Sequence, residues 1–336
     1  MSAADEGRTG PDQIRLRHSE SLPPHPRAGR CRVSVVILTI NEATNIARCL
    51  RALDWCEDVV LVDSGSTDQT LSIAREVRPD VRIFEHDFED FGQQRNFALD
   101  QTGLPYEWVL FLDADEVCPP ELAVQIRQVV ETPLGPGEPI AYFLTCRNLF
   151  LGRWLKRCTL YPSWQLRLLK RGEVRYRREG HGQREVTDGP IGYLDQPYDH
   201  YGFSQGIEHW IARHNHYSTA EVELIHRMRR EPLAPGDLWS GDPVRRRRCL
   251  KRMSARVGCR PLFRFLYLYV IRRGFLDGTA GWIFCQLRVA HEIHITAKLA
   301  EEESRQRLAG ETAQQPGTAQ LPPAAETFAP LPLDTL

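Results

Sequence analysis

Short apolar runs alternate with amphipathic stretches in the first part of the chain. Residues 33–40 (VSVVILTI), 59–62, 81–84 and 108–112 are mostly apolar, as strands buried on both faces of a sheet are. Between the first two runs, Ile46, Leu50 and Leu53 recur at helical spacing. Strands that alternate with helices predict parallel βαβ units in a doubly wound α/β sheet. The pair Thr39 and Glu42 has the spacing of a capping box for the first helix.

The alternation of strands and helices ends at a Pro- and Gly-rich loop at residues 132–139. Residues 141–146, 165–169 and 174–178 resemble strands with shorter connections, which predicts an antiparallel addition to the sheet. Helices are expected towards the C-terminus, from about residue 204 to 228 and again from 282 to 300. No stretch approaches the eighteen or so uninterrupted apolar residues that a transmembrane helix needs.

Composition divides the chain into four parts. With 42% hydrophobic residues, the 336-residue chain can bury a substantial core. We predict a disordered segment at residues 1–30, an α/β domain at 31–228, a basic and aromatic helical region at 229–309, and a disordered tail at 310–336. The first segment has no apolar core and is not expected to be a secretory signal. The nine cysteines form no C-x-x-C pair, which favours a reducing cytoplasm over a disulfide or zinc framework.

Three acids, Asp113, Asp115 and Glu116, follow directly after the apolar run at 108–112. Asp113 and Asp115 are one residue apart, so their side chains point the same way on an extended chain and can share one cation. A divalent cation held there, Mg²⁺ or Mn²⁺, would neutralise a diphosphate group. An isolated pair of acids after a strand is more often a solvated loop, so the surrounding segments decide between the two interpretations.

Four segments give the chain a resemblance to the family 2 glycosyltransferases, which have the GT-A fold. They are residues 35–42 (VVILTINE), 62–68 (VDSGSTD), 94–96 (QRN) and 112–116 (LDADE). Their order and spacing match as well. Residues 142–221 are similar to the branch that makes lipopolysaccharide cores and other bacterial surface glycans, notably at 148–150 (NLF), 180–185 (GHGQRE) and 200–201 (HY).

The resemblance implies a site for a nucleotide-sugar donor beside a divalent cation. It assigns donor binding to Asn41, Glu42, Asp63, Arg95 and Asp113, and metal binding to Asp113, Asp115 and His200. A carboxylate such as Asp63 can accept from a base or ribose, and a guanidinium such as Arg95 can bond phosphate oxygens in pairs. His200 is one of eleven histidines, and a single histidine is more often an ordinary hydrogen-bonded residue.

An inverting sugar transfer also needs a base that takes the proton of the acceptor hydroxyl. The candidates are Glu179, His181 and Glu185, of which Glu185 is preferred and Glu179 comes second. Related branches carry a His-Glu pair here, whereas Gly182 follows His181 in this chain. The assignment of the base therefore stays open. The acceptor implied is a hydroxyl of a glycan or a lipid-linked glycan.

A basic run at residues 245–260 precedes an aromatic run at 262–269. One interpretation is a solvated helix face next to core residues. The other is a peripheral, non-spanning attachment of a cytoplasmic protein to an anionic membrane surface. Nucleic acid is not expected as a partner, because no nucleic-acid-binding motif accompanies the basic run.

Two other functions compete with sugar transfer. Residues 109–117 also fit the nucleophile motif of haloacid-dehalogenase-like phosphatases, but that motif belongs on a first strand and about eighty ordered residues precede it here. The second alternative is a GT-A-like domain that binds a nucleotide or glycan without catalysis.

Overall fold

The computed structural model describes residues 29–313 except Leu134, Pro136, Ser254, Val257 and the segments 180–181, 233–234, 240–248 and 250–251. The chain divides into two compact units. The first contains the described residues up to Leu149 together with Tyr161–Ser204, and the second contains Phe150–Leu160 and the described residues from Gln205 onward. Each unit is treated by itself below.

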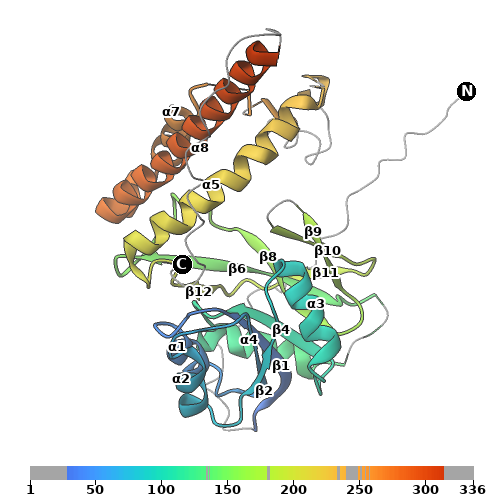
Figure 1. Ribbon diagram of the computed structural model, residues 1–336. Helices are drawn as coiled ribbons and strands as arrows, with labels where there is room; N and C mark the ends of the chain where they lie inside the picture. The colour runs from blue at the N-terminus through green and yellow to red at the C-terminus, as the bar shows by residue number, and fades with distance from the viewer. Residues whose placement is uncertain are drawn as a thin grey trace, which may run out of the picture. The chain divides into compact units, whose positions relative to one another are not determined.

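The first unit is built on four parallel strands in the order β3-β2-β1-β4 (Figure 1). The strands are β1 (Cys31–Thr39), β2 (Cys56–Asp63), β3 (Arg82–Glu85) and β4 (Trp108–Asp113). The helices between and after them are α1 (Ile46–Arg51), α2 (Thr70–Val77), α3 (Phe91–Gln101) and α4 (Pro120–Glu131). This order confirms the predicted βαβ series. The chain runs outward from β1 to β3 and returns to the other side of β1, so the strand order reverses there.

Backbone register brings three strand ends to one edge of the sheet. Thr39 at the end of β1 pairs with Asp63 of β2, and Leu38 pairs with Asp113 of β4. In open α/β sheets, ligands bind beyond the carboxyl ends of the strands at the point where the order reverses. The fold therefore places Asp63 and Asp113 where a ligand site is expected.

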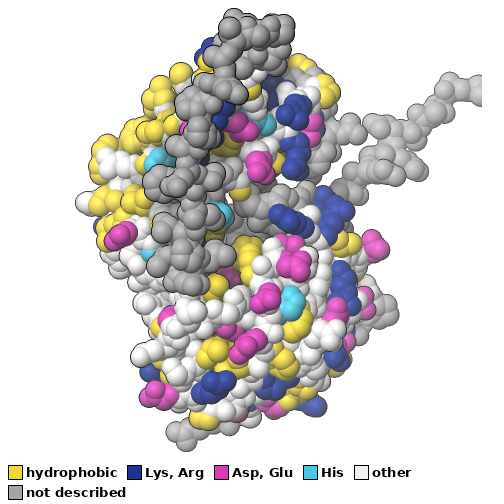
Figure 2. All heavy atoms as spheres, viewed as in Figure 1, with side chains coloured by type: hydrophobic (Ala, Val, Ile, Leu, Met, Phe, Trp, Pro, Cys, Tyr) yellow, Lys and Arg dark blue, Asp and Glu magenta, His cyan; other side chains and the backbone are white. Residues whose placement is uncertain are grey.

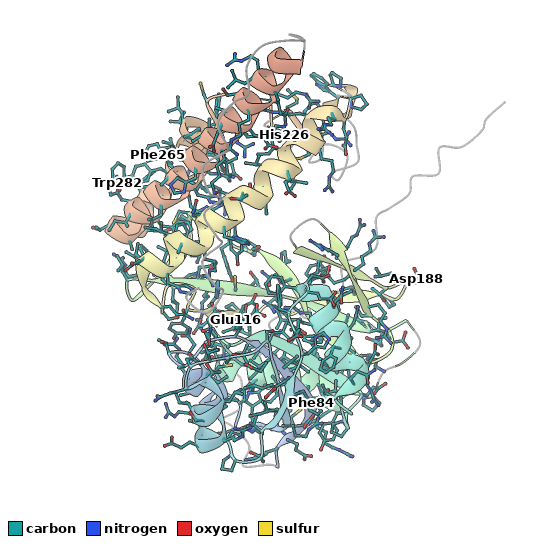
Figure 3. The ribbon with its side chains drawn as sticks, in the orientation of Figure 1. Phe84, Glu116, Asp188, His226, Phe265 and Trp282 are labelled. Carbon is teal, nitrogen blue, oxygen red and sulfur yellow. The ribbon has the colours of Figure 1, made fainter. Side chains whose placement is uncertain are left out.

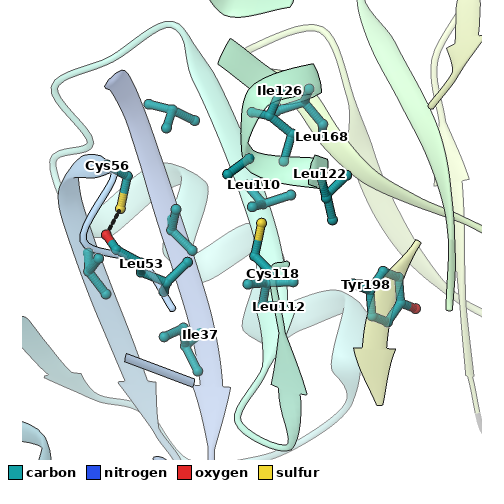
Figure 4. Close-up of a cluster of buried hydrophobic side chains, with 14 of the residues drawn as sticks. Ile37, Leu53, Cys56, Leu110, Leu112, Cys118, Leu122, Ile126, Leu168 and Tyr198 are labelled. Atoms are coloured by element: carbon teal, nitrogen blue, oxygen red, sulfur yellow. Dashed lines mark hydrogen bonds between the residues drawn. The ribbon is translucent and has the colours of Figure 1, made fainter. Parts of the chain in front are cut away.

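Both faces of β1 are buried, as its apolar run predicts. Val35 and Ile37 pack on one face against Leu110 and Leu112, in the cluster that Figure 4 shows. The intervening Val36 and Leu38 pack on the opposite face with Val109 and Phe111. Alternation along adjacent strands thus divides the core into two layers.

The predicted antiparallel addition is confirmed for one strand of the sheet. β8 (Trp164–Lys170) pairs antiparallel with both β4 and β6 (Ala141–Phe150). Beyond β6, β12 (Tyr198–His200) runs parallel to β6 and antiparallel to the two-residue β5 (Glu116–Val117). β11 (Ile191–Tyr193) also runs parallel to β6.

One strand of the predicted addition lies elsewhere. β9 (Arg175–Glu179) pairs with β10 (Gly182–Val186) in a separate two-stranded sheet. Asn96 of α3 explains the placement, because its side chain donates to the Tyr176 carbonyl at 2.8 Å and accepts from the Tyr176 amide at 3.1 Å. These bonds hold the backbone of β9 against α3.

The second unit is helical apart from β7 (Arg153–Trp154). Its elements are α5 (Gly206–Arg230), the 3₁₀ turn η1 (Pro235–Trp239), α7 (Arg260–Phe265), the π-helical turn η2 (Leu266–Ile271), the 3₁₀ turn η3 (Gly274–Asp277) and α8 (Gly278–Ala313). Val222 and Ile225 of α5 pack with Ile295 and Leu299 of α8. Among the helices that the structure describes, none combines the length and apolar character needed to cross a bilayer.

The predicted domain limits differ from the limits of the compact units. The units separate at Ser204, so α5 belongs with the C-terminal helices instead of ending the first domain at residue 228. Most of the predicted disordered ends and half of the basic run at 245–260 lie outside the described residues. Helix α8 continues to Ala313, four residues into the predicted tail.

Candidate active site

Two buried arginines hold the carboxylate at the end of β4. Asp113 Oδ2 accepts from Arg167 Nη2 at 3.0 Å, and Oδ1 accepts from Arg95 Nη2 at 3.3 Å. The arginine side chains are only 4% and 5% exposed, whereas Asp113 is 36% exposed. Burial alone would raise the pKa of Asp113, but the two guanidinium groups hold it well below its usual value. Asp113 is therefore a fixed anion with one side open to solvent.

Arg167 is the main residue of this site that the sequence patterns missed. Its Nη2 also donates to Glu116 Oε1 at 2.6 Å, and Glu116 lies inside the first unit (Figure 3). The other carboxylate oxygen of Glu116 accepts from the Asp113 amide at 2.9 Å. Burial raises the pKa of Glu116 to about 7, although Arg167 opposes the shift. A lone arginine inside the run Leu166–Leu169 of a buried strand is the available sequence signal, because buried charges need partners.

Nε and Nη1 of Arg167 are buried and have no hydrogen-bond partner within the part of the chain that the structure describes. Nε of Arg95 is also buried and has no hydrogen-bond partner among the described residues. Buried N–H groups are seldom left unpaired, since each forfeits its bonds to water. The site thus keeps two arginines at a cost in stability, which is a common property of functional sites.

Asp115 and His200, two of the three predicted metal ligands, lie next to each other. His200 Nε2 lies 3.3 Å from Asp115 Oδ2, and Nδ1 lies 2.9 Å from Asn148 Oδ1. Register explains the arrangement, because β12 sets His200 opposite Glu116 on one side and Asn148 on the other. Burial lowers the pKa of His200, but the Asp115 carboxylate outweighs it and raises the pKa to about 9.

The pair fits two positions of a cation's coordination shell. Ligands at about 2.1 Å from one tetrahedral or octahedral metal lie about 3.0–3.4 Å apart, and the His200–Asp115 separation falls in that range. A bond from Nδ1 to Asn148 would leave Nε2 as the ligand atom, as in known metal sites. In the described residues, however, no three His, Cys, Asp or Glu side chains are arranged to hold a metal. Asp113, the third predicted ligand, is bonded to Arg95 and Arg167 instead.

Asn41, Glu42 and Asp63 organise the loops beside this cluster. The Asn41 side-chain oxygen accepts from the Thr67 amide at 2.8 Å, and Asn41 has a positive φ of 51°, which asparagine tolerates better than most residues. Asp63 is nearly fully buried and accepts from the amides of Gly65 and Ser66 at 3.0 and 2.7 Å. The Asn41 bond ties the loop after β1 to the loop after β2, and the Asp63 bonds hold the second loop in shape.

The predicted capping box at Thr39 is wrong. Thr39 is the last residue of β1, and α1 begins only at Ile46. Glu42 accepts from the Asn45 side-chain amide at 2.6 Å instead. The β-branched run keeps Thr39 in the strand, so the helix cannot start there.

The segment 94–96 connects α3 to three parts of the site. Gln94 donates to Ser64 Oγ at 2.7 Å, next to the end of β2. Arg95 bonds Asp113 and, through Nη1, Gln183 Oε1 of β10 at 2.7 Å. Asn96 holds β9, as described above. Three consecutive polar residues thus link the two sheets of the first unit.

The candidate bases lie on β9 and β10 or between them. Glu185 is half-buried on β10, two residues from Gln183, so both side chains lie on the same face of the strand. Gln183 contacts Arg95, and Arg95 contacts Asp113. Glu185 thereby shares a face of β10 with Gln183, which contacts Arg95. His181 and the side chain of Glu179 lie outside what the structure describes.

Comparison with known proteins identifies relatives of the first unit. Residues 34–134 match the family described as "Glycosyl transferase family 2". Over 148 residues the chain is 28% identical to the lipopolysaccharide core biosynthesis glycosyltransferase LpsC of Rhizobium meliloti, covering 43% of this chain and 53% of the relative. It is 33% identical over 99 residues to the uncharacterized glycosyltransferase RC0292 of Rickettsia conorii, covering 29% and 34%.

Among solved structures, S. aureus TarS 1–349 is similar with a TM-score of 0.40 and 17% identity, covering 82% of this chain and 91% of the TarS 1–349 chain. The chain spans about half or less of the length of the two curated relatives above. The matched segment runs from within β1 through β4 and includes all three acids at 113–116. The resemblance to family 2 is thus confirmed for the segment that carries Asp113 and Asp115, whereas Arg167, Glu185 and His200 lie outside it.

Removal of Arg167 tests whether it secures the two acids. We expect Arg167→Ala to lower the free energy of unfolding of the first unit by about 3–5 kcal/mol, because two carboxylates lose their buried partner. Arg171→Ala, at an exposed position just beyond β8, is the control and should change it by less than about 0.5 kcal/mol. Urea unfolding followed by far-UV circular dichroism measures both. Equal midpoints for the two variants would show that Arg167 is dispensable for stability.

Proposed function

Residues 34–134 make this chain a relative of the family 2 glycosyltransferases, and from that premise we propose that it transfers a sugar from a nucleotide-diphosphate sugar to a hydroxyl group. The observation that carries the proposal is the acidic cluster of Asp113 and Asp115 with His200 at the edge of the sheet where the strand order reverses. The cluster lies on the segment that matches the family. A bare sheet edge without these charges would support no transfer chemistry.

The donor's diphosphate is proposed to bind at the acidic cluster together with Mg²⁺ or Mn²⁺. Asp115 and His200 would hold the cation, with Asp113 beside them. Such a cation neutralises charge on a departing diphosphate. Arg95 is proposed to lie near the same phosphates. Arg95 and Arg167 both pair with Asp113, and Arg167 also pairs with Glu116, so the charges of the arginines are compensated before the donor enters.

The nucleoside is proposed to rest against the loops that follow β1 and β2. Asn41 and Asp63 order these loops, and Glu42 lies between them and α1. Asp63 already accepts three hydrogen bonds from the loop that follows it. A carboxylate has about four acceptor positions, which leaves Asp63 about one for a base or ribose, at a residue that is nearly fully buried.

The transfer itself is proposed to invert the sugar's anomeric carbon in one displacement. The acceptor oxygen forms the new bond to that carbon, the bond to the diphosphate oxygen breaks, and the nucleoside diphosphate leaves with the electron pair. Glu185 is the proposed base that takes the acceptor's proton, with Glu179 and His181 as alternatives. Its place on the Gln183 face of β10 supports this choice.

The acceptor is proposed to be a glycan or lipid-linked glycan of a bacterial surface polysaccharide or lipopolysaccharide. The similarity to LpsC, which is described as a lipopolysaccharide core glycosyltransferase, supports this class. We place the reaction in the cytoplasm, at the surface of the membrane that holds a lipid-linked acceptor. All nine cysteines are free thiols, which is consistent with a reducing compartment.

Donor binding should depend on the Asp115–His200 pair. We expect wild-type protein to bind one nucleotide-sugar from a panel of uridine, guanosine and thymidine diphosphate sugars only when Mn²⁺ or Mg²⁺ is present. Asp115→Asn and His200→Gln should each weaken that binding at least about tenfold, because a charged or nitrogen ligand is lost. Isothermal titration calorimetry measures the affinities.

The control for this experiment is Asp188→Asn. Asp188 is an exposed acid at the periphery of the first unit (Figure 3), so its replacement should leave the affinity unchanged. Unaltered binding in folded Asp115→Asn and His200→Gln proteins would count against the proposed site. Release of inorganic phosphate from sugar phosphates, detected with malachite green, would instead favour the phosphatase alternative.

Replacement of the base should separate catalysis from binding. We expect Glu185→Gln to lower kcat by about 10²–10⁴-fold, the usual contribution of a general base, while donor affinity stays within twofold. Glu173→Gln, at an exposed position before β9, should leave both unchanged. Release of nucleoside diphosphate in the presence of acceptor gives kcat. A wild-type kcat in Glu185→Gln would show that Glu185 is not the base and would leave Glu179 or His181 as the candidates.

A further inference from the structure

An exposed apolar surface covers the end of the second unit that carries α7, η2 and η3. We call it the apolar face and define it by Leu262, Phe263, Val270, Ile271, Phe275 and Leu276. Their exposed fractions range from 47% for Phe275 to 70% for Ile271. Figure 2 shows hydrophobic side chains gathered over the region of α7 and the start of α8. Single exposed apolar residues are normal, whereas a contiguous group of this kind marks an interaction surface.

The backbone explains why so many apolar residues of one short segment are exposed. η2 is a π-helical turn, closed by a bond from the Arg272 amide to the Tyr267 carbonyl at 2.8 Å. The wider turn leaves Leu268 as its buried residue and exposes Val270 and Ile271. Such π turns occur frequently at functional positions.

Aromatic rings beneath the face hold it in one shape. Phe265 stacks on Tyr269 with ring centroids 5.1 Å apart, and Trp282 of α8 meets both rings edge-on at 5.7 and 5.1 Å. Phe265 and Trp282 lie together at this end of the unit in Figure 3. Glu292 of α8 adds ion pairs to Arg260 and Arg264. The apolar residues are therefore displayed on a rigid support.

The sequence that leads into the face and forms it carries basic residues and no acids. From residue 243 to residue 276 the sequence contains eleven Lys and Arg residues and no Asp or Glu. Arg273 is exposed between Ile271 and Phe275. The next acid, Asp277, is buried and accepts from the amides of Arg157 and Cys158 at 2.9 Å. Apolar side chains that project from a basic segment match the interface of an anionic bilayer, where aromatic and aliphatic groups enter the headgroup layer.

We propose that the apolar face attaches the protein peripherally to a bilayer that contains anionic lipids. A second copy of the chain would bring two basic segments together, and nucleic acid would leave the aliphatic residues Leu262, Val270 and Ile271 without partners. Both are therefore poorer matches than a lipid surface. The attachment is independent of donor binding, because it uses neither the acidic cluster nor a nucleotide.

Vesicle flotation without nucleotide or metal tests the attachment. Full-length protein should float with phosphatidylcholine vesicles that contain phosphatidylglycerol, and at least about tenfold less with pure phosphatidylcholine. The double variant Ile271→Asp with Phe275→Asp should lose at least about tenfold in partitioning, because charged side chains replace those that enter the bilayer. Both positions are about half exposed or more, and unchanged circular dichroism would confirm that the variant folds.

Leu308→Asp is the matched control. Leu308 is a similarly exposed leucine on α8, 26 residues beyond Trp282, which is about 39 Å along a helix. The Leu308→Asp protein should bind vesicles as the wild type does. Equal flotation of the double variant and the wild type would overturn the proposal. A second result would also overturn it: the wild type sediments as a dimer, the double variant sediments as a monomer, and neither protein floats with vesicles. The apolar face would then bind a second copy of the chain.

Discussion

The ion pairs of Arg167 with Asp113 and Glu116 are the interaction on which the site depends. A carboxylate removed from water is costly unless a cation or several donors compensate it. Arg167 compensates two at once, from a strand that neighbours β4. Without Arg167, the end of β4 would have to turn outward so that water could solvate its acids. The guanidinium therefore fixes where the negative charge of the site lies.

The rest of the first unit secures this arrangement from several sides. Arg95 reaches the same carboxylate from α3, and His200 reaches Asp115 from β12. Side-chain bonds from Asn41 and Asp63 hold the adjoining loops. Charges fixed before a substrate arrives need little reorganisation during the reaction, and this is the main source of electrostatic catalysis. The architecture thus suits a site that receives a cation and a diphosphate.

The sequence was sufficient for the strand–helix series because apolar periodicity reflects burial directly. It also paired Asp115 with His200, although only through a family resemblance. It did not reveal that Arg167 bonds Asp113, because the two are 54 residues apart and no local pattern links them. The position of β9 was missed for the same reason, since it depends on Asn96 of α3. Long-range polar contacts leave little trace in periodicity or propensity.

We propose that Asp115 and His200 hold a cation beside a bound diphosphate. The most direct test is a crystal grown with Mn²⁺ and the nucleoside diphosphate of the donor, measured for anomalous scattering from manganese. We expect one manganese peak, bonded to the Asp115 carboxylate, to His200 Nε2 and to phosphate oxygens. A bound nucleotide with manganese at another position, or with no manganese peak near these residues, would contradict it.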